Sequence, residues 1–163
     1  MPPVPRPNPY GTFNFVLSFI DGPSEAQDAL ETLGFMECTG LDGDTMPMEY
    51  RDTKIPNGAG DGAFVRKLPG MESYPNVVLR RGVTGSPALW AWRKKVRDGD
   101  PWEEIKANIL VNLQNEKHEV VMRWRLQDAW PCKLSGPALN ARTNEIAVET
   151  LEVCCDRIEL SED

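Results

Sequence analysis

Residues 118–156, HEVVMRWRLQDAWPCKLSGPALNARTNEIAVETLEVCCD, contain the patterning that decides the fold. Apolar and polar side chains alternate over residues 119–129, which is typical of a strand with one buried face. Trp130-Pro131 predicts a corner, and a Gly-Pro turn then separates this strand from a second one over residues 145–156. Two long patterned strands without a recognisable set of catalytic residues predict a sheet that must meet other sheets.

The second of these strands changes phase. Ile146 and Val148 stand at even positions, whereas Leu151 and Val153 stand at odd positions, so in a regular strand the two pairs lie on opposite faces. Two interpretations follow. Either a bulge near Glu149-Thr150 re-phases the strand, or both faces are covered, one by the core and one by a neighbour.

Alternation also dominates the rest of the chain. Phe13, Phe15, Leu17 and Phe19 share one face of a strand over residues 13–20, and we expect that face to be buried. Ser86-Pro87 predicts the start of a helix that ends at Asp98-Gly99. Further strands are predicted over residues 35–39, 46–51, 63–67, 77–83 and 105–114, with a turn at 68–70 and a short helix over 24–32.

The sum is seven or eight strands and one firm helix. It predicts a mainly β protein, a small antiparallel β-barrel or sandwich with one flanking α-helix. A chain of 163 residues suits one domain, over residues 13–160, preceded by a proline-rich arm over residues 1–12.

Composition excludes several classes of function. The net charge of -7 argues against a nucleic-acid binder, no apolar run is long enough to predict a membrane anchor, and the first residues do not resemble a secretory signal. The four cysteines form no C-x-x-C pair and the only histidine is His118, so we expect no metal and no cofactor. The cysteines are interpreted as small buried hydrophobes in a reducing compartment. No nucleophile accompanies His118, and we expect no enzymatic activity.

Two other features could indicate ligand binding. Residues 52–62 are rich in glycine, but no G-K-[ST] follows, so a loop between strands is favoured over a phosphate site. A ligand-binding β-barrel stays an alternative because the chain has five tryptophans, which are more typical of core and interface positions: Trp90, Trp92, Trp102, Trp124 and Trp130.

Six motifs, in order along residues 13–160, resemble those of the tail-tube (inner-tube) proteins of contractile phage tails and contractile injection systems. The matching segments are FMECTGL (35–41), EYR (49–51), KLPG (67–70), NVVLRRG (76–82) with the LWAW helix (89–92), AWPCK (129–133) and NEIAVE (144–149). The segment from Gly22 to Leu33, in which a helix is predicted, departs from the family, which usually has a loop there.

The resemblance implies a fold similar to the ring protein of type VI secretion. It implies a structural subunit whose hexameric rings stack into a hollow inner tube, a conduit for DNA or protein cargo within a contractile sheath. Expected partners are the protein itself, the sheath protein, and baseplate, spike and tail-terminator proteins. The protein would be cytoplasmic during assembly and then part of a virion tail or an injection-system particle. A tube-initiator or baseplate adaptor of the same fold, which caps the tube, is the alternative.

Two sets of residues fit this role. The glycine-rich loop has charged residues that we predict to order against the next ring: Arg51, Asp52, Lys54 and Asp61. The strand with two apolar phases predicts an inter-subunit sheet at Ile146, Val148, Leu151 and Val153. An acidic balance also suits a lumen that must not retain an anionic polymer.

Overall fold

A computed structural model describes residues 7–31, 34–52 and 64–161, which form two compact units. One unit comprises residues 42–74 and is a β-hairpin, called the hairpin unit below. The other comprises residues 1–41 and 75–163 and is called the main unit. Both consist largely of antiparallel strands, so the prediction of a mainly β protein is confirmed.

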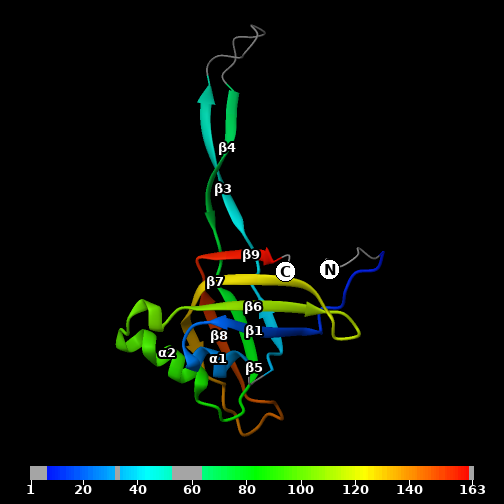
Figure 1. Cartoon of the computed structure of the whole chain (residues 1–163), viewed down its shortest axis with the longest axis vertical. Helices are drawn as coiled ribbons and strands as arrows, with labels where there is room; N and C mark the ends of the chain where they lie inside the picture. The colour runs from blue at the N-terminus through cyan, green and yellow to red at the C-terminus, as the bar shows by residue number, and fades with distance from the viewer. Residues whose placement is uncertain (1–6, 32–33, 53–63, 162–163) are drawn as a thin grey trace. The chain divides into compact units, whose positions relative to one another are not determined.

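The main unit contains a seven-stranded antiparallel sheet (Figure 1). The strands pair in the order β1 (Phe15–Asp21), β6 (Ala107–Gln114), β7 (Val120–Ser135), β8 (Val148–Cys154), β5 (Val77–Gly82) and β2 (Glu37–Thr39). A further strand, β9 (Arg157–Ser161), pairs with the first part of β7 and was missed from the sequence because it is short and follows β8 after only two residues.

Strand β7 joins the two parts of this sheet. Its first part pairs with β6 and β9, and its last residues, from Trp130 onward, pair with β8. The strand does not end at Trp130-Pro131, where the corner was predicted, but it changes its partner from β6 to β8 between Ala129 and Trp130. An irregularity precedes this change: Asp128 has φ 49°, and its backbone N–H donates to the side chain of Asn108. Asp tolerates this left-handed conformation, which lets β7 change partners without ending.

Two helices belong to the main unit, the firm one and the short one predicted over residues 24–32. They are α1 (Ser24–Glu31) and α2 (Ala88–Asp98), with a 3-10 turn at Trp102–Glu104. Ala26, Ala29 and Leu30 of α1 and Leu89 and Trp92 of α2 lie in the same core cluster as the sheet residues. Gly99, with φ 77°, ends α2 in the left-handed conformation that favours glycine, as predicted. A Glu25–Lys95 ion pair of 3.0 Å links the two helices.

The sequence indicated a phase change in β8 because a charged residue, Glu149, occupies one of its buried positions. Glu149, Leu151 and Val153 alternate as buried residues, and the pairing with β5 is regular from Val77↔Val153 to Gly82↔Val148, which excludes a bulge at Glu149-Thr150 in this pairing. Glu149 is polar and was therefore not recognised in the sequence as a residue of the buried face. Ile146 lies before the strand and is 83% exposed.

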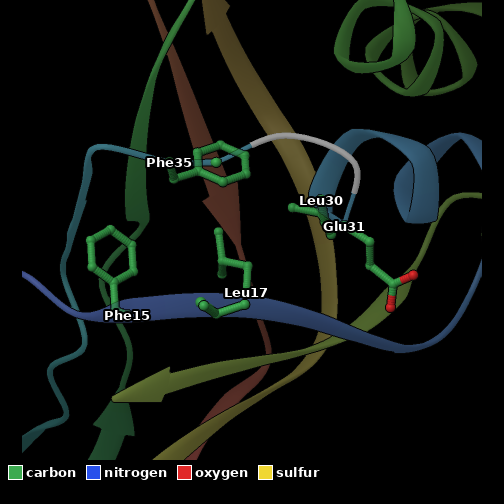
Figure 2. A pocket seen from close by; sticks show the side chains of 7 residues that line it. Phe15, Leu17, Leu30, Glu31 and Phe35 are labelled. Carbon is green, nitrogen blue, oxygen red and sulfur yellow. The ribbon is translucent and has the colours of Figure 1, made fainter. Parts of the chain in front are cut away.

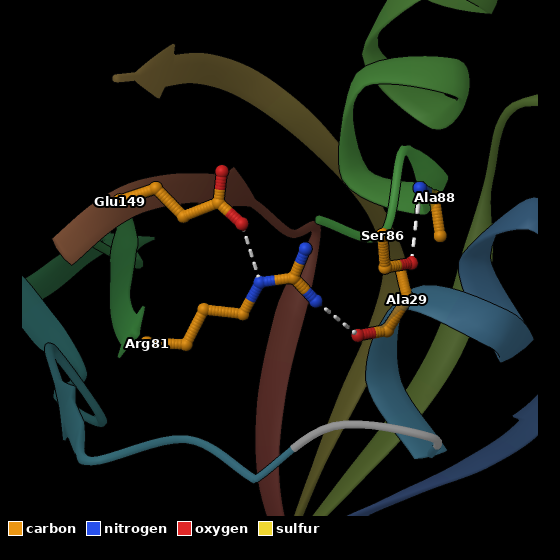
Figure 3. A network of polar contacts seen from close by, with 5 residues as sticks. All are labelled: Ala29, Arg81, Ser86, Ala88 and Glu149. Carbon is orange, nitrogen blue, oxygen red and sulfur yellow. Dashed lines mark hydrogen bonds and ion pairs between the residues drawn. The ribbon is translucent and has the colours of Figure 1, made fainter. Parts of the chain in front are cut away.

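Glu149 is buried because it pairs with Arg81, which lies directly opposite on β5. Arg81 Nε donates to Glu149 at 2.6 Å, and Nη1 donates to the Ala29 carbonyl of α1 at 3.4 Å (Figure 3). Nη2 has no hydrogen-bond partner within the described residues. A buried charge without a partner is costly, so this pair ties α1 to the centre of the sheet and constrains both strands.

Three local predictions are wrong. Phe13 precedes β1 and is 76% exposed, so it does not share the buried face of Leu17. Leu68-Pro69-Gly70 is not a turn but part of a continuous strand. The four cysteines are half-buried rather than fully buried.

We expect Glu149→Leu to lower the free energy of unfolding by about 3–5 kcal/mol, because Arg81 then remains buried without its partner. Arg81→Met combined with Glu149→Leu should recover most of this loss, since no charge is left in the core. Urea denaturation of each variant measures the effect.

The matched control is Glu152→Leu, a substitution in the same strand as Glu149. It removes the partly exposed ion pair with Lys133 of β7 and should lower the free energy of unfolding by less than about 1 kcal/mol. A Glu149→Leu protein as stable as the Glu152→Leu protein would contradict the role given to the buried pair.

Candidate assembly surface

The hairpin unit is a two-stranded ribbon of β3 (Asp44–Asp52) and β4 (Phe64–Ser73). Pro47 lies opposite Pro69, and the register shifts between Thr45 and Pro47. Proline is tolerated here because both strands lie at sheet edges, where a missing N–H breaks no central ladder. Residue 70 must be glycine, since a Cβ there would clash with the carbonyl oxygen of Met46. The segment read as a turn from its composition is therefore an irregular part of a strand.

One face of this ribbon is apolar. Met46, Met48 and Tyr50 alternate along β3, and Leu68 lies opposite Met48 on β4, so the four side chains share a face. Their exposed fractions are 63%, 56%, 43% and 46%. We call these four residues the apolar hairpin face.

The opposite face of the ribbon is polar over much of its length. Glu49 and Lys67 are register partners there and form an exposed ion pair of 3.3 Å. Thr45 and Arg51 share this face by alternation, as do the paired Pro47 and Pro69 and the exposed Val65 opposite Arg51. The two faces therefore differ chiefly around Met48 and Glu49, where an apolar pair lies on one face and an ion pair on the other.

An isolated two-stranded hairpin is marginally stable in water, and a long apolar edge is a site of association. Methionine side chains are flexible and polarisable, so they adapt to the surface that covers them. The hairpin is thus suited to contact with another protein surface. Sequence reasoning missed this face because a turn was placed at residues 68–70; the alternation of Met46, Met48 and Tyr50 was the available signal.

The residues predicted for the ring-stacking loop are only partly described. Arg51 lies at the exposed end of β3, and Asp52 is its last residue. Lys54 and Asp61, like the rest of the loop over residues 53–63, lie outside the described residues. Their role stays a prediction.

The residues predicted for an inter-subunit sheet separate into two groups. Leu151 and Val153 are completely buried in the core of the main unit, so they have no surface to offer a neighbour. Ile146 is exposed and Val148 is half-buried. Strand β8 pairs with β5 from Val148 to Val153 and with β7 from Thr150 to Cys154, so both of its edges are paired where Leu151 and Val153 lie. Contact of Ile146 and Val148 with a neighbour stays a prediction.

The pocket at β1 is small (Figure 2). It has a volume of about 120 Å³ and is lined mainly by apolar side chains, among them Phe15, Leu17, Leu30 and Phe35. Glu31 at its rim accepts a hydrogen bond from the backbone N–H of Phe19. Pockets that bind small molecules usually measure about 300–1,000 Å³, so this one does not resemble a ligand site.

The five tryptophans lie in different environments. Trp92 is fully buried, and its indole N–H donates to the Ile105 carbonyl at 2.8 Å. Trp102 and Trp130 pack edge to face with their ring centres 6.2 Å apart. Trp124 and Trp130 are half-buried, whereas Trp90 and Trp102 are 52% and 43% exposed, so only Trp92 is a core residue.

The titratable groups indicate structural roles. Burial raises the pKa of Cys38 and of Cys155 to about 11, so both thiols are protonated at neutral pH and are poor nucleophiles. The hydrogen bond from Lys95 lowers the pKa of Glu25, which keeps the link between α1 and α2 charged. In the part of the chain that the structure describes, no cluster of three metal-ligating side chains occurs. No helix among the described residues is both long and apolar enough to cross a membrane.

Comparison with known families gives one match over most of the chain. The family model described as "T4-like virus tail tube protein gp19" matches residues 11–159. No curated protein matches the chain at a significant level.

Solved structures of similar fold come from contractile injection systems. A chain from the structure of the anti-feeding prophage cap (tube-terminating cap) is 28% identical, with a TM-score of 0.77 over 98% of this chain and 95% of that chain. A chain of the PVC sheath-tube complex in the extended state is 27% identical, with a TM-score of 0.75 over 96% and 94%. A chain of the PVC sheath/tube terminator is 28% identical, with a TM-score of 0.75 over 94% and 97%.

We expect Met48→Ser combined with Leu68→Ser to change the free energy of unfolding of the dispersed monomer by no more than about 1 kcal/mol, because both side chains are about half exposed. Leu151→Ala, which truncates a fully buried side chain, should cost about 2–5 kcal/mol and serves as the comparison. Denaturation at a protein concentration too low for association measures both. Equal losses in the two proteins would show that the apolar hairpin face belongs to the monomer core.

Proposed function

The chain belongs to the family of T4-like virus tail tube proteins, and on that premise we propose that it is the subunit of hexameric rings that stack into the hollow inner tube of a contractile tail or injection system. The single observation that supports this role most strongly is the apolar hairpin face, which the hairpin unit itself leaves in water. A structural, non-enzymatic role accords with the family.

A ring of identical subunits gives every hairpin the same partner. Such a ring uses heterologous contacts that close by rotation, so a patch on one protomer meets a different patch on the next. The apolar hairpin face lies on one side of the ribbon, and the Glu49–Lys67 pair lies on the other. One-sided patterning of this kind suits a ribbon that lies against a neighbouring copy.

The loop over residues 53–63, at the end of the hairpin, is proposed to contact the ring above or below. Lys54 and Asp61 in the loop, with Arg51 and Asp52 at the end of β3 before it, supply both signs of charge. A polar, glycine-rich segment loses conformational entropy when it orders, and this cost is offset only where it gains contacts in the assembled tube.

The proposed partners of this chain, and the particle it belongs to, are inferred from the assemblies that contain similar chains. One belongs to a sheath-tube complex and another to a sheath/tube terminator, both at 27–28% identity over nearly the whole chain. We propose that this chain likewise works inside a contractile sheath, between a baseplate with its spike and a terminator, as part of a virion tail or an injection-system particle. DNA or protein cargo would pass through the lumen, and the net charge of -7 favours passage of an anionic polymer without adhesion.

A cap or terminator is the second candidate. A chain from the structure of the anti-feeding prophage cap is about as similar to this chain as a chain from the PVC sheath-tube complex is, with TM-scores of 0.77 and 0.75. The length of the assembly distinguishes the two. A main tube subunit should give long tubes in negative-stain micrographs of the purified protein, and a cap should give isolated rings or monomers.

The apolar hairpin face provides a specific test. We expect Met48→Ser combined with Leu68→Ser to abolish long tubes while leaving a folded, soluble protein, because the change removes apolar contact area between copies. Negative-stain microscopy together with circular dichroism measures both outcomes.

The matched control is Glu49→Ser combined with Lys67→Ser, which alters a directly paired position on the opposite face and should still give tubes. Tubes of normal length and yield from the Met48/Leu68 variant would refute the assignment of this face to the interface.

Deletion of residues 53–60 separates stacking from ring formation. The deletion should leave soluble rings or monomers but no long tubes, because the contacts between successive rings are lost. Sedimentation velocity and microscopy of the variant measure the size distribution. If normal tubes form, the loop does not stack the rings.

A further inference from the structure

Two of the four cysteines lie beside each other on the outward face of the main sheet. Cys132 is in β7 and Cys154 is the last residue of β8. In this part of β8 the residues facing the core are Leu151 and Val153, so Cys154 points away from it, and the buried Pro131 places Cys132 on the same outward side.

A bulge in β7 places Cys132 diagonal to Cys154. Trp130 pairs with Cys154, Pro131 pairs with Val153, and Lys133 pairs with Glu152, so Cys132 is the extra residue of β7. Diagonal neighbours in a regular antiparallel pair have Cα atoms about 7–8 Å apart. A disulfide needs Cα atoms about 4.4–6.8 Å apart, so the bond requires a small shift of the two strands at the bulge.

One amide side chain contacts both sulfurs. The Cys154 thiol donates to Asn76 Oδ1 at 3.0 Å, and Asn76 Nδ2 donates to Cys132 Sγ at 3.5 Å. The Cys132 thiol also donates to the Glu152 carbonyl of β8 at 3.2 Å, which holds its sulfur toward the neighbouring strand. Both cysteines are partly exposed, so a small reagent reaches them.

We propose that Cys132 and Cys154 are a latent redox pair that a small-molecule disulfide converts into an intramolecular disulfide between β7 and β8. One thiolate attacks a sulfur of the reagent, which forms a mixed disulfide and releases one small thiol. The second cysteine then attacks the protein sulfur of the mixed disulfide and releases the second small thiol. The two cysteines lose two electrons and two protons, and the reagent is reduced to two thiols.

The bond would close a loop around residues 136–147, which contain no strand. A cross-link of this kind restricts the unfolded chain, so the oxidised protein should melt several degrees above the reduced one. Burial, with a hydrogen bond to Cys132 as the next cause, raises the pKa of Cys154 to about 11, so its thiolate is scarce at neutral pH. Exchange should therefore quicken as the pH rises from about 7 to about 9.

The test uses the full chain and oxidised glutathione at alkaline pH, followed by acid quenching, alkylation of free thiols and tryptic mass mapping. The expected product joins the peptides of residues 126–133 and 143–157 and reverts with dithiothreitol. Cys155 shares the second peptide with Cys154, so Cys155→Ser should keep the link, while Cys154→Ser and Cys132→Ser should lose it.

Cys38 is the internal control: its thiol should stay free during oxidation and should therefore be alkylated afterwards. The proposal is overturned if Cys132 and Cys154 of the wild-type protein stay free, carry only glutathione, or link to Cys155 or to another chain. The wild-type protein alone shows whether the two peptides are joined, and fragmentation of the linked peptide between Cys154 and Cys155, or the Cys155→Ser variant, assigns the bond to Cys154.

Discussion

The main unit depends on β7 having hydrogen-bonded partners along nearly its whole length. Its first part pairs with β6 and β9 and its last part pairs with β8. Asp128, just before the change of partners, allows the strand to pass from one to the other without ending. The Arg81–Glu149 pair then fixes β5 and β8 in one register and ties α1 to them, because any slip would separate two buried charges. The helices and the smaller strands pack on this frame.

The hairpin unit has the opposite property, since its strands pair only with each other among the described residues. Its polar face has an ion pair, whereas its apolar face consists of side chains that remain about half exposed or more. A chain that satisfies its own core in one unit and leaves an amphipathic ribbon in another is physically suited to assembly. The same features would be an aggregation hazard in a monomer, so the tube role accounts for a surface that monomer stability does not explain.

Period-two patterning predicted most strands and the fold class, because a strand with one buried face has apolar residues at every second position. It misjudged β8 because Glu149, a charged residue, occupies a core position. The available signal was that Arg81 alternates with the apolar residues of β5 and Glu149 alternates with Leu151, which indicates a buried ion pair. It placed a turn at Leu68-Pro69-Gly70 because composition does not distinguish a turn from an irregular edge strand. The hairpin's apolar face was therefore missed. Which exposed residues meet another copy depends on quaternary contacts, which one chain's periodicity does not encode.

The central claim is that the apolar hairpin face is covered by another copy of the chain in an assembled tube. A cryo-electron microscopy reconstruction of the assembled wild-type protein tests it most directly. The account predicts hexameric rings in which Met46, Met48 and Leu68 lose most of their exposed area against a neighbouring subunit. A tube in which these side chains remain in solvent, with the subunits joined through other surfaces, would contradict it.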